Sequence, residues 1–319
     1  MSEFDLIRRY FTRPTPGAVL GVGDDAALLH VSDGMELAVS TDMLVSGTHF
    51  FSDTDPYLLG RKTLAVNLSD MAAMGAAPRW ATLSMSLPNA DEHWLQRFSA
   101  GFYIMADEYG VELVGGDTTR GPLNLSVTIM GEVPRGKALL RNGAQVGDDI
   151  WVSGALGEAA LGLAHLQSKM MLPDDVRAFC LDALLQPHPR VALGLALRGI
   201  AHSAIDVSDG LLSDLGHILE CSNVAAEIRY DKVPTSPFFA YSGKEMHGLA
   251  QHCVLSGGDD YELCFTAPFA QRDEIDAISA RLDLPLTNIG KIVSGRGCKV
   301  RNADGSVMKI KEAGYDHFA

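Results

Sequence analysis

Hydrophobic and polar positions repeat along this chain with two periods, and each period predicts a type of secondary structure. Helical spacing of apolar residues predicts helices over 3–12, 56–74, 91–109, 158–167, 190–199, 211–219 and 273–282. Short apolar or alternating runs predict strands over 26–30, 36–40, 80–87, 111–114, 123–129, 150–153, 201–207, 225–230, 261–266 and 288–292. Helices and strands are mixed in both halves, so we expect an α/β or α+β fold.

The pattern is interrupted once, by a polar and glycine-containing segment at Arg141–Asp149 (RNGAQVGDD). Such a segment is typical of a domain boundary. A chain of 319 residues is long enough for two domains. We therefore predict an N-terminal domain over 1–140 and a C-terminal α/β domain over 141–319.

The predicted strand 201–207 runs directly into a polar turn and then a helix. Ser208 or Asp209 is expected to cap that helix, because a short side-chain oxygen can accept from its first free N–H groups. Asp206 at the end of a buried strand needs a cation or a firm hydrogen-bond partner. Asp214, one helical turn further on, is assigned to the surface. The stretch is thus a candidate arm of a metal site.

Three further acids occur where a predicted element meets a glycine, serine or threonine turn: Asp25 in GVGDD, Asp42 in STD and Asp117 in GGDTT. Asp70 lies inside a predicted helix, beside its apolar face. Taken singly, each acid is also explained as a turn former or a helix cap. Taken together with Asp206, they favour a site for Mg²⁺, which prefers hard oxygen ligands and substrate phosphate.

Phosphate binding is the expected companion of such a site. The chain has no G-x-x-x-x-G-K-[ST] and no G-x-G-x-x-G that opens a helix, which argues against a P-loop ATPase and a simple dinucleotide-binding fold. Gly154–Gly157 precedes a predicted helix and is either an anion cradle or an ordinary tight turn. Arg141 is either a bidentate phosphate ligand or a surface residue. His49 is the histidine that best fits a site role, although lone histidines are more often structural.

Composition limits the class of protein and its compartment. Hydrophobic residues make up 47% and charged residues 21%, as in soluble globular proteins. The net charge of −14 argues against a nucleic-acid surface and fits either a cation-gathering enzyme or a generally acidic protein. The five cysteines form no C-x-x-C, which favours a reducing compartment and no structural zinc. Without a signal peptide or an 18-residue apolar run, we expect a cytoplasmic protein with no membrane partner.

Seven motifs together resemble the thiamine-monophosphate kinase family, which belongs to a superfamily with aminoimidazole ribotide synthetase and selenophosphate synthetase. The resemblance covers nearly the whole chain. The motifs are GVGDDA (21–26), STDMLVSGTHF (40–50), NLSDMAAMGAAP (67–78), GGDTTRG (115–121), IDVSDGLLSDL (205–215), SGGDDYEL (256–263) and GYDHF (314–318).

The resemblance implies phosphorylation of thiamine monophosphate to thiamine diphosphate by direct in-line transfer from ATP, with Mg²⁺. It also implies a homodimer, in which the N-terminal sheet pairs with its twin in a barrel. By matching position, the implied metal ligands are Asp25, Ser40, Thr41, Asp42, Asp70, Asp117, Asp206 and Asp209. The implied nucleotide contacts are Gly116, Asp117, Arg141 and Ser208, and the implied substrate contacts are His49, Asp259 and Tyr315.

This sequence departs from the family pattern at two places. Position 259 is Asp where many relatives are expected to have Glu, so the side chain reaches less far. The aromatic residue that stacks on the nucleotide has no clear counterpart, although spacing points to the stretch Ser99–Tyr103.

Two other functions are weighed against the kinase. A synthetase of the same superfamily would use a reactive cysteine, but residues 1–30 contain none and the last three residues are His317, Phe318 and Ala319. A non-catalytic Mg-nucleotide-binding protein would be expected to lose the acid turns, which are intact here.

Overall fold

The computed structural model describes residues 2–236, 238–239, 247–310 and 314–315. The chain divides into two compact units, each with its own sheet. The first unit comprises Met1–Met71 and Ala76–Gly136, and the second comprises Ala72–Gly75 and Lys137–Ala319. The second unit therefore begins before the polar segment 141–149 and includes a short piece that follows Met71.

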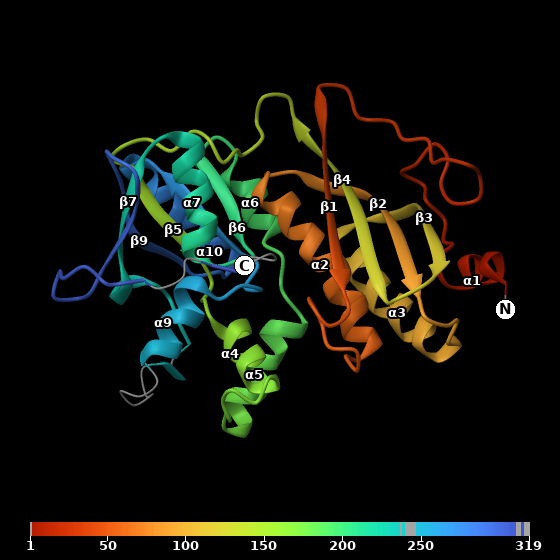
Figure 1. Ribbon diagram of the computed structural model, residues 1–319. Helices are drawn as coiled ribbons and strands as arrows, with labels where there is room; N and C mark the ends of the chain where they lie inside the picture. Colours follow the sequence, from red (N-terminus) through yellow and green to blue (C-terminus); the bar gives the residue numbers. More distant parts are fainter. Residues whose placement is uncertain (1, 237, 240–246, 311–313, 316–319) are drawn as a thin grey trace. The chain divides into compact units, whose positions relative to one another are not determined.

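The first unit is a four-stranded sheet with helices along one side (Figure 1). Its strands, in the spatial order β1-β4-β2-β3, are β1 (Met35–Val45), β4 (Asn124–Pro134), β2 (Ala77–Leu87) and β3 (Glu112–Arg120). Strands β1, β4 and β2 pair antiparallel, whereas β2 and β3 are parallel. Its helices are α1 (Glu3–Tyr10), α2 (Pro56–Ala73) and α3 (Glu92–Tyr109).

The two faces of this sheet differ in what covers them. Leu125, Val127 and Ile129 of β4 are fully buried at alternate positions, as expected for the face that packs on helices. On the other face of the sheet, alternate apolar side chains of β1 are exposed: Leu37, Val39 and Met43 are 42%, 56% and 53% exposed. The first unit therefore presents an apolar strip on the strand at the edge of its sheet.

The second unit is built on a six-stranded sheet in the order β10-β7-β9-β5-β8-β6. The strands are β5 (Asp149–Ser153), β6 (Ser203–Val207), β7 (Ala225–Arg229), β8 (Glu262–Ala267), β9 (Leu286–Val293) and β10 (Gly297–Arg301). The helices are α4 (Glu158–Leu166), α5 (Asp174–Leu185), α6 (Val191–Leu197), α7 (Leu211–Ser222), α9 (His247–Ser256) and α10 (Arg272–Leu282). Strands β7 and β10 are parallel, and the other pairs are antiparallel.

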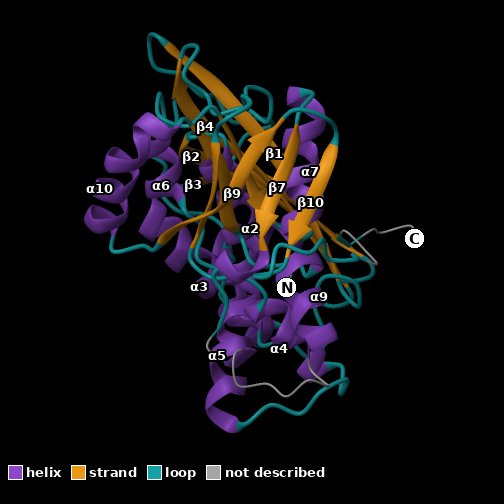
Figure 2. Cartoon of the chain, turned by 90° about the vertical axis from the view of Figure 1, so that its left-hand side faces the viewer, coloured by secondary structure: helices purple, strands orange, loops and turns teal. Residues whose placement is uncertain are grey.

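Helices cover both faces of the second sheet. Helix α7 lies in front of it and α10 behind it in Figure 1, and α4, α5 and α9 gather at one end in Figure 2. Leu211, Leu215 and Ile218 of α7 pack with Ile150 and Val207 in the main core. This mixed sheet with helices on both faces confirms the expected α/β class.

Several predicted strands differ from the structure, and three of the differences lie beside predicted metal ligands. Residues 26–30 form no strand, and Leu28 makes only an isolated bridge to Leu20. Strands β1 and β3 were predicted to end before Asp42 and Asp117. In the structure both strands continue through these acids, because the neighbouring strands offer hydrogen bonds along their whole length. These two acids therefore lie within strands and not in turns. Elements α5, α9 and β10 were not predicted from the sequence.

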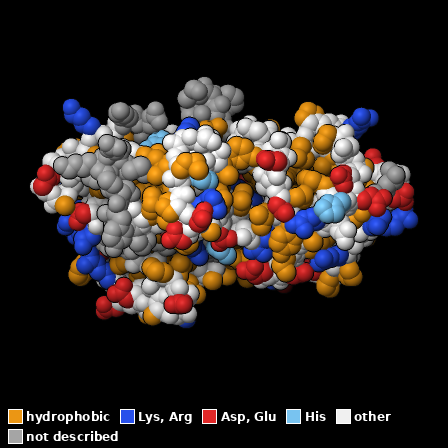
Figure 3. Space-filling model, turned by 90° about the horizontal axis from the view of Figure 1, so that it is seen from below, with side chains coloured by type: hydrophobic (Ala, Val, Ile, Leu, Met, Phe, Trp, Pro, Cys, Tyr) orange, Lys and Arg blue, Asp and Glu red, His pale blue; other side chains and the backbone are white. Residues whose placement is uncertain are grey.

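Three further observations bear on the composition. In the part of the chain that the structure describes, no helix is both long enough and apolar enough to cross a membrane. All five cysteines carry free thiols. On the face seen in Figure 3, acidic, basic and hydrophobic side chains are interspersed.

Candidate functional site

Strand β1 and helix α2 of the first unit bring three predicted oxygen ligands together. The hydroxyl of Ser40 donates to Asp70 Oδ2 over 2.5 Å. The N–H of Asp42, two residues along the strand, donates to Asn67 Oδ1 on the same helix over 3.2 Å. Because residues two apart on a strand share a face, Ser40 and Asp42 both lie on the side of α2. Helix α2 is buried nearly all round, and Asn67 and Ser69 are buried with it.

The other predicted ligands of the first unit lie elsewhere. Thr41 lies on the opposite face of β1, where its hydroxyl is 2.8 Å from that of Thr128. Asp117 is exposed on β3 at the far side of the sheet, paired with Ser84. Asp25 is exposed in a loop, where its N–H donates to the Asp24 carboxylate over 3.0 Å. The structure thus gathers Ser40, Asp42 and Asp70 but does not join Thr41, Asp117 or Asp25 to them.

His49 and Gly116 are each fixed by a backbone contact. The N–H of Val45 donates to His49 Nδ1 over 3.0 Å, so the neutral ring carries its proton on Nε2. Gly116 has a φ of 149°, and a Cβ there would lie 1.9 Å from the carbonyl oxygen of Leu83. Position 116 therefore accepts only glycine.

Aromatic residues of the stretch Ser99–Tyr103 do not present an open stacking face. Phe102 is fully buried and Tyr103 is 6% exposed. The Arg13 guanidinium lies over the Tyr103 ring at 3.6 Å, and burial raises the pKa of Tyr103 to about 12. A cavity of about 300 Å³ lies beside Arg13, Tyr103 and Glu112, and Tyr103 is its one lining residue from the stretch considered for nucleotide stacking.

In the second unit, the turn between β6 and α7 is held from within by Asp214. This side chain is 3% exposed, and its Oδ2 accepts the N–H groups of Ser208, Asp209 and Gly210 over 3.0, 3.1 and 3.0 Å. Two predictions are therefore wrong. Asp214 is not a surface acid, and neither Ser208 nor Asp209 caps α7, because Gly210 occupies the N-cap position without a side-chain hydrogen bond.

The turn concentrates negative charge. Asp206, at the end of β6, is only 6% exposed. Burial, together with the nearby carboxylates of Asp206 and Asp209, raises the pKa of Asp214 to about 7, against the lowering effect of the N–H donors. A region of this kind attracts a cation, because a cation offsets the mutual repulsion of carboxylates.

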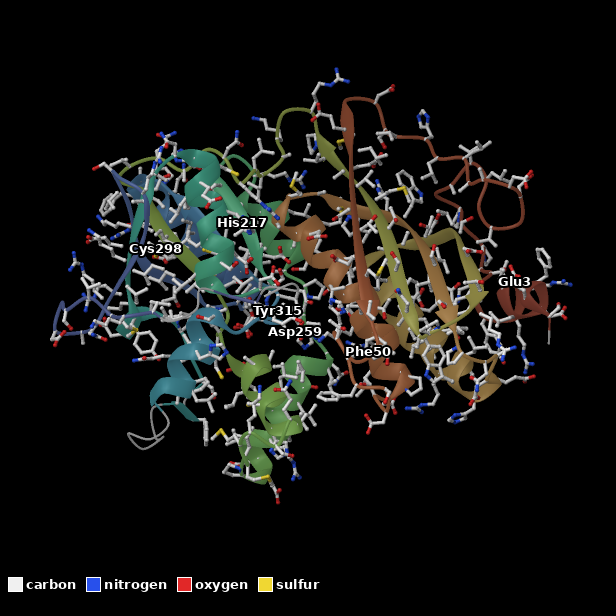
Figure 4. All side chains as sticks on the ribbon, viewed as in Figure 1. Glu3, Phe50, His217, Asp259, Cys298 and Tyr315 are labelled. Carbon is white, nitrogen blue, oxygen red and sulfur yellow. The ribbon has the colours of Figure 1, made fainter. Side chains whose placement is uncertain are left out.

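Backbone hydrogen bonds attach two distant segments to this turn. The N–H of Asp259 donates to the Ser208 carbonyl over 2.8 Å, and the N–H of Tyr315 donates to the Asp209 carbonyl over 3.0 Å. The two labelled residues stand close together in the view of Figure 4, and they are bonded to the carbonyls of consecutive residues. The structure thus brings together five predicted residues from three motifs, namely Asp206, Ser208, Asp209, Asp259 and Tyr315. The rest of the terminal motif, 316–318, lies outside the described residues.

The shorter side chain at position 259 is held in a defined place. Asp259 has a φ of 69°, a left-handed conformation that is uncommon for residues other than glycine. Its Oδ1 accepts the phenolic hydroxyl of Tyr261 over 3.0 Å.

Arg141 lies at the opposite end of α7 from the turn. Its side chain is exposed, and its carbonyl accepts the hydroxyl of Ser222, the last residue of that helix, over 3.2 Å. A helix of 12 residues is about 18 Å long, so Arg141 and Ser208 can share only an extended ligand.

The glycine loop before α4 already has a hydrogen-bond acceptor from within the chain. The N–H of Gly157 donates to both carboxylate oxygens of Asp260, over 3.1 and 3.0 Å. The carboxyl group of Asp260 thus occupies the position at this loop where a bound phosphate was one of the two predicted alternatives. Burial raises the pKa of Asp260 well above its usual range. The sequence contained this residue in SGGDDYEL, but only tertiary structure shows which N–H it meets.

The carboxylate of Glu262, which is buried, lies near Asp260. Glu262 is bound by the Arg190 guanidinium, with Nε to Oε2 at 2.7 Å, and by the hydroxyl of Ser153. Burial, with a smaller contribution from the Glu262 charge, raises the pKa of Glu158 to about 7. Arg190 and Glu262 had no role in the sequence prediction.

The donor chemistry of both units suits Mg²⁺. Among the described residues, no group of three or more His, Cys, Asp or Glu side chains is arranged to enclose a metal. The gathered atoms are carboxylate and hydroxyl oxygens, which are hard ligands. Mg²⁺ commonly binds through one or two carboxylates and keeps waters and substrate phosphates as its other ligands. The residues therefore fit Mg²⁺ and do not form a closed metal cage.

Comparisons with known proteins place this architecture in a family. The model of the AIR synthase related protein N-terminal domain matches residues 23–133, and that of the C-terminal domain matches 145–302. The fold and its sites therefore define an AIR synthase-related protein. Thiamine-monophosphate kinase of Escherichia coli strain K12 is 47% identical over 323 residues, which cover 99% of this chain and 98% of that protein. The chain belongs to the thiamine-monophosphate kinase family.

Solved structures agree. Thiamine-monophosphate kinase from Stenotrophomonas maltophilia K279a superposes with a TM-score of 0.84 at 50% identity, covering 96% of each chain. The structure of AaThiL complexed with AMPPCP and TMP has a TM-score of 0.79 at 30% identity, covering 99% of this chain and 96% of that one.

Proposed function

We propose that this protein phosphorylates thiamine monophosphate to thiamine diphosphate, using ATP and Mg²⁺, by direct in-line phosphoryl transfer. Two findings support the reaction: full-length identity to thiamine-monophosphate kinases, and a structural relative complexed with AMPPCP and TMP. The observation that carries it within this chain is the turn that gathers Asp206, Ser208 and Asp209 with Asp259 and Tyr315.

The chemistry explains why this site has carboxylates and no evident general base. A phosphate monoester has a second pKa near 6, so the acceptor is already largely dianionic at pH 7. The difficulty is to bring two anionic phosphates together while charge spreads over the transferring group. Bound Mg²⁺ would neutralise that charge. The protein's task is to hold oxygen ligands and phosphate donors in place before the reaction.

We propose the following roles for the residues. In the first unit, Ser40, Asp42 and Asp70 bind metal on the side of the sheet that faces α2. Asp25, Thr41 and Asp117 bind metal at other positions of the same unit. In the second unit Asp206 and Asp209 bind metal. Gly116, Asp117, Arg141 and Ser208 contact the nucleotide. His49, Asp259 and Tyr315 contact thiamine monophosphate.

We also propose that the protein is a cytoplasmic homodimer in which the N-terminal sheets pair into a barrel. The exposed strip of Leu37, Val39 and Met43 supports sheet pairing, because burying it removes apolar surface from water. Five free thiols support a reducing compartment.

The proposed reaction is tested by coupled detection of ADP release with thiamine monophosphate and Mg²⁺. We expect turnover that disappears with EDTA and when unphosphorylated thiamine replaces the acceptor. Binding of AMPPCP is measured separately by calorimetry. Nucleotide binding without turnover on thiamine monophosphate would overturn the kinase in favour of a non-catalytic nucleotide-binding protein.

A further inference from the structure

Asp214 makes an unusual set of contacts for a helix residue. One oxygen of its carboxylate accepts three successive backbone N–H groups, those of Ser208, Asp209 and Gly210. The side chain is 3% exposed, so these bonds are shielded from water. Hydrogen bonds between N–H donors and a carboxylate are stronger than those between neutral groups. The three bonds therefore fix the path of the backbone through the turn.

The same turn is confined on its outer side. Gly210 has a φ of 120°, and a Cβ there would lie 2.7 Å from the backbone of Ser256. The carbonyls of Ser208 and Asp209 accept the N–H groups of Asp259 and Tyr315. The carbonyl groups of Ser208 and Asp209 thus accept hydrogen bonds from these outer segments, whereas the N–H groups of the turn all donate to Asp214.

We propose that Asp214 is a positioning residue, which holds the turn so that Ser208 and Asp209 present their side chains to the metal and nucleotide. This inference rests on the proposed function. Asp214 touches no reacting atom. Its effect passes through the backbone of two residues that do the binding, and also through the segments of Asp259 and Tyr315 that are attached to the turn.

A purely structural role would give a different result. If Asp214 only stabilised the second unit, its loss would lower the free energy of unfolding without changing how the folded protein binds nucleotide. Asp149 supplies a matched control, because it is also a fully buried carboxylate of the second unit and pairs with Arg272 at 2.6 Å, on the other face of the sheet from α7.

The test compares Asp214→Ala, Asp214→Asn and Asp149→Asn in the full-length protein. Amide hydrogen exchange at 208–210 and calorimetric binding of AMPPCP with Mg²⁺ are measured beside kcat and KM. For Asp214→Ala we expect faster exchange at these three amides, at least 10-fold weaker AMPPCP binding, and a loss of kcat/KM of about 100-fold, as for misplaced active-site groups. Asp214→Asn keeps one oxygen acceptor and should fall between Asp214→Ala and the wild type.

Asp149→Asn should lower the free energy of unfolding while AMPPCP affinity and kcat per folded molecule stay as in the wild type. If Asp214→Ala does not fold, Asp214→Asn decides, with at least 3-fold weaker AMPPCP binding expected. The proposal is overturned if the folded Asp214 variants bind AMPPCP like the wild type, or if exchange at 208–210 is unchanged. Failure of the proposed function is distinct, because the wild-type protein itself would then show no turnover.

Discussion

The hydroxyl of Ser40 and the carboxylate of Asp70 are joined across strand β1 and helix α2 by a hydrogen bond of 2.5 Å. Thirty positions separate them in the chain, yet together with Asp42 they place three predicted oxygen ligands on one side of the sheet.

Replacing Asp42 or Asp117 with Asn should reduce kcat by at least about 100-fold, the usual effect of removing an electrostatic group from a transition-state site. The free energy of unfolding should change little, because loss of a carboxylate relieves repulsion in the metal-free protein. ADP-release kinetics and urea unfolding measure the two effects. Asp33→Asn, at an exposed position of the same unit, should change neither. A large loss of stability in metal-free protein would mark Asp42 and Asp117 as structural.

Replacing Gly116 with Ala should destabilise the first unit by about 3 kcal/mol or more, because strain at a positive φ adds to a clash with backbone. The added Cβ would lie 1.9 Å from the Leu83 carbonyl oxygen, which is held in strand β2. Gly115→Ala is the control, since a Cβ there meets only Thr82 Cγ2 at 3.7 Å. Denaturant unfolding distinguishes them, and equal stability of the two variants would contradict the described backbone.

Replacing Glu158 with Gln should change how stability depends on pH. The pKa of Glu158 is about 7 in the folded protein against 4.5 for the free side chain, so the folded state holds the proton more tightly. Between pH 4.5 and 7 this group therefore makes the free energy of unfolding fall as pH rises. Glutamine does not ionise, so the variant should match the wild type near pH 4 and exceed it by about 3 kcal/mol at pH 8.

Urea unfolding at both pH values measures this difference. Glu220→Gln, at an exposed position on α7, should leave the pH profile unchanged. A Glu158→Gln protein that is less stable than the wild type at pH 8 would show that the ionised carboxylate has a favourable partner.

Replacing Val39 with Lys should dissociate the proposed homodimer, because a charge in the centre of an apolar contact loses its hydration without a partner. Val39 is 56% exposed in the single chain, so the monomer itself should tolerate the change. Sedimentation velocity measures the association state. Val19→Lys, at a loop position that is 68% exposed, is the control and should remain dimeric. A monomeric wild-type protein would refute the pairing.

Much of the fold could be read from local patterns. Helix α3 spans Glu92–Tyr109 where 91–109 was predicted, and α2 spans Pro56–Ala73 where 56–74 was predicted. Apolar periodicity, proline starts and glycine stops act within a few residues, so they are visible in the sequence. The loop at 26–30 was mistaken for a strand because a short apolar run need not pair with a sheet: Leu28 is 54% exposed and makes only an isolated bridge to Leu20.

The sequence by itself determined which acids occur in motifs and that a strand, a turn and a helix follow one another around Asp206. Tertiary structure alone decided that β1 and β3 run through Asp42 and Asp117, since strand length depends on the pairing offered by neighbouring strands. It also decided that Asp214 is buried beneath three N–H groups and that Asp260 accepts the N–H of Gly157 just before α4. The Gly157 N–H that Asp260 accepts lies 103 residues away in the chain, so no local pattern encodes that contact. The donors of Asp214 lie only four to six residues away, and there it is the burial of the turn that depends on the packing of distant segments.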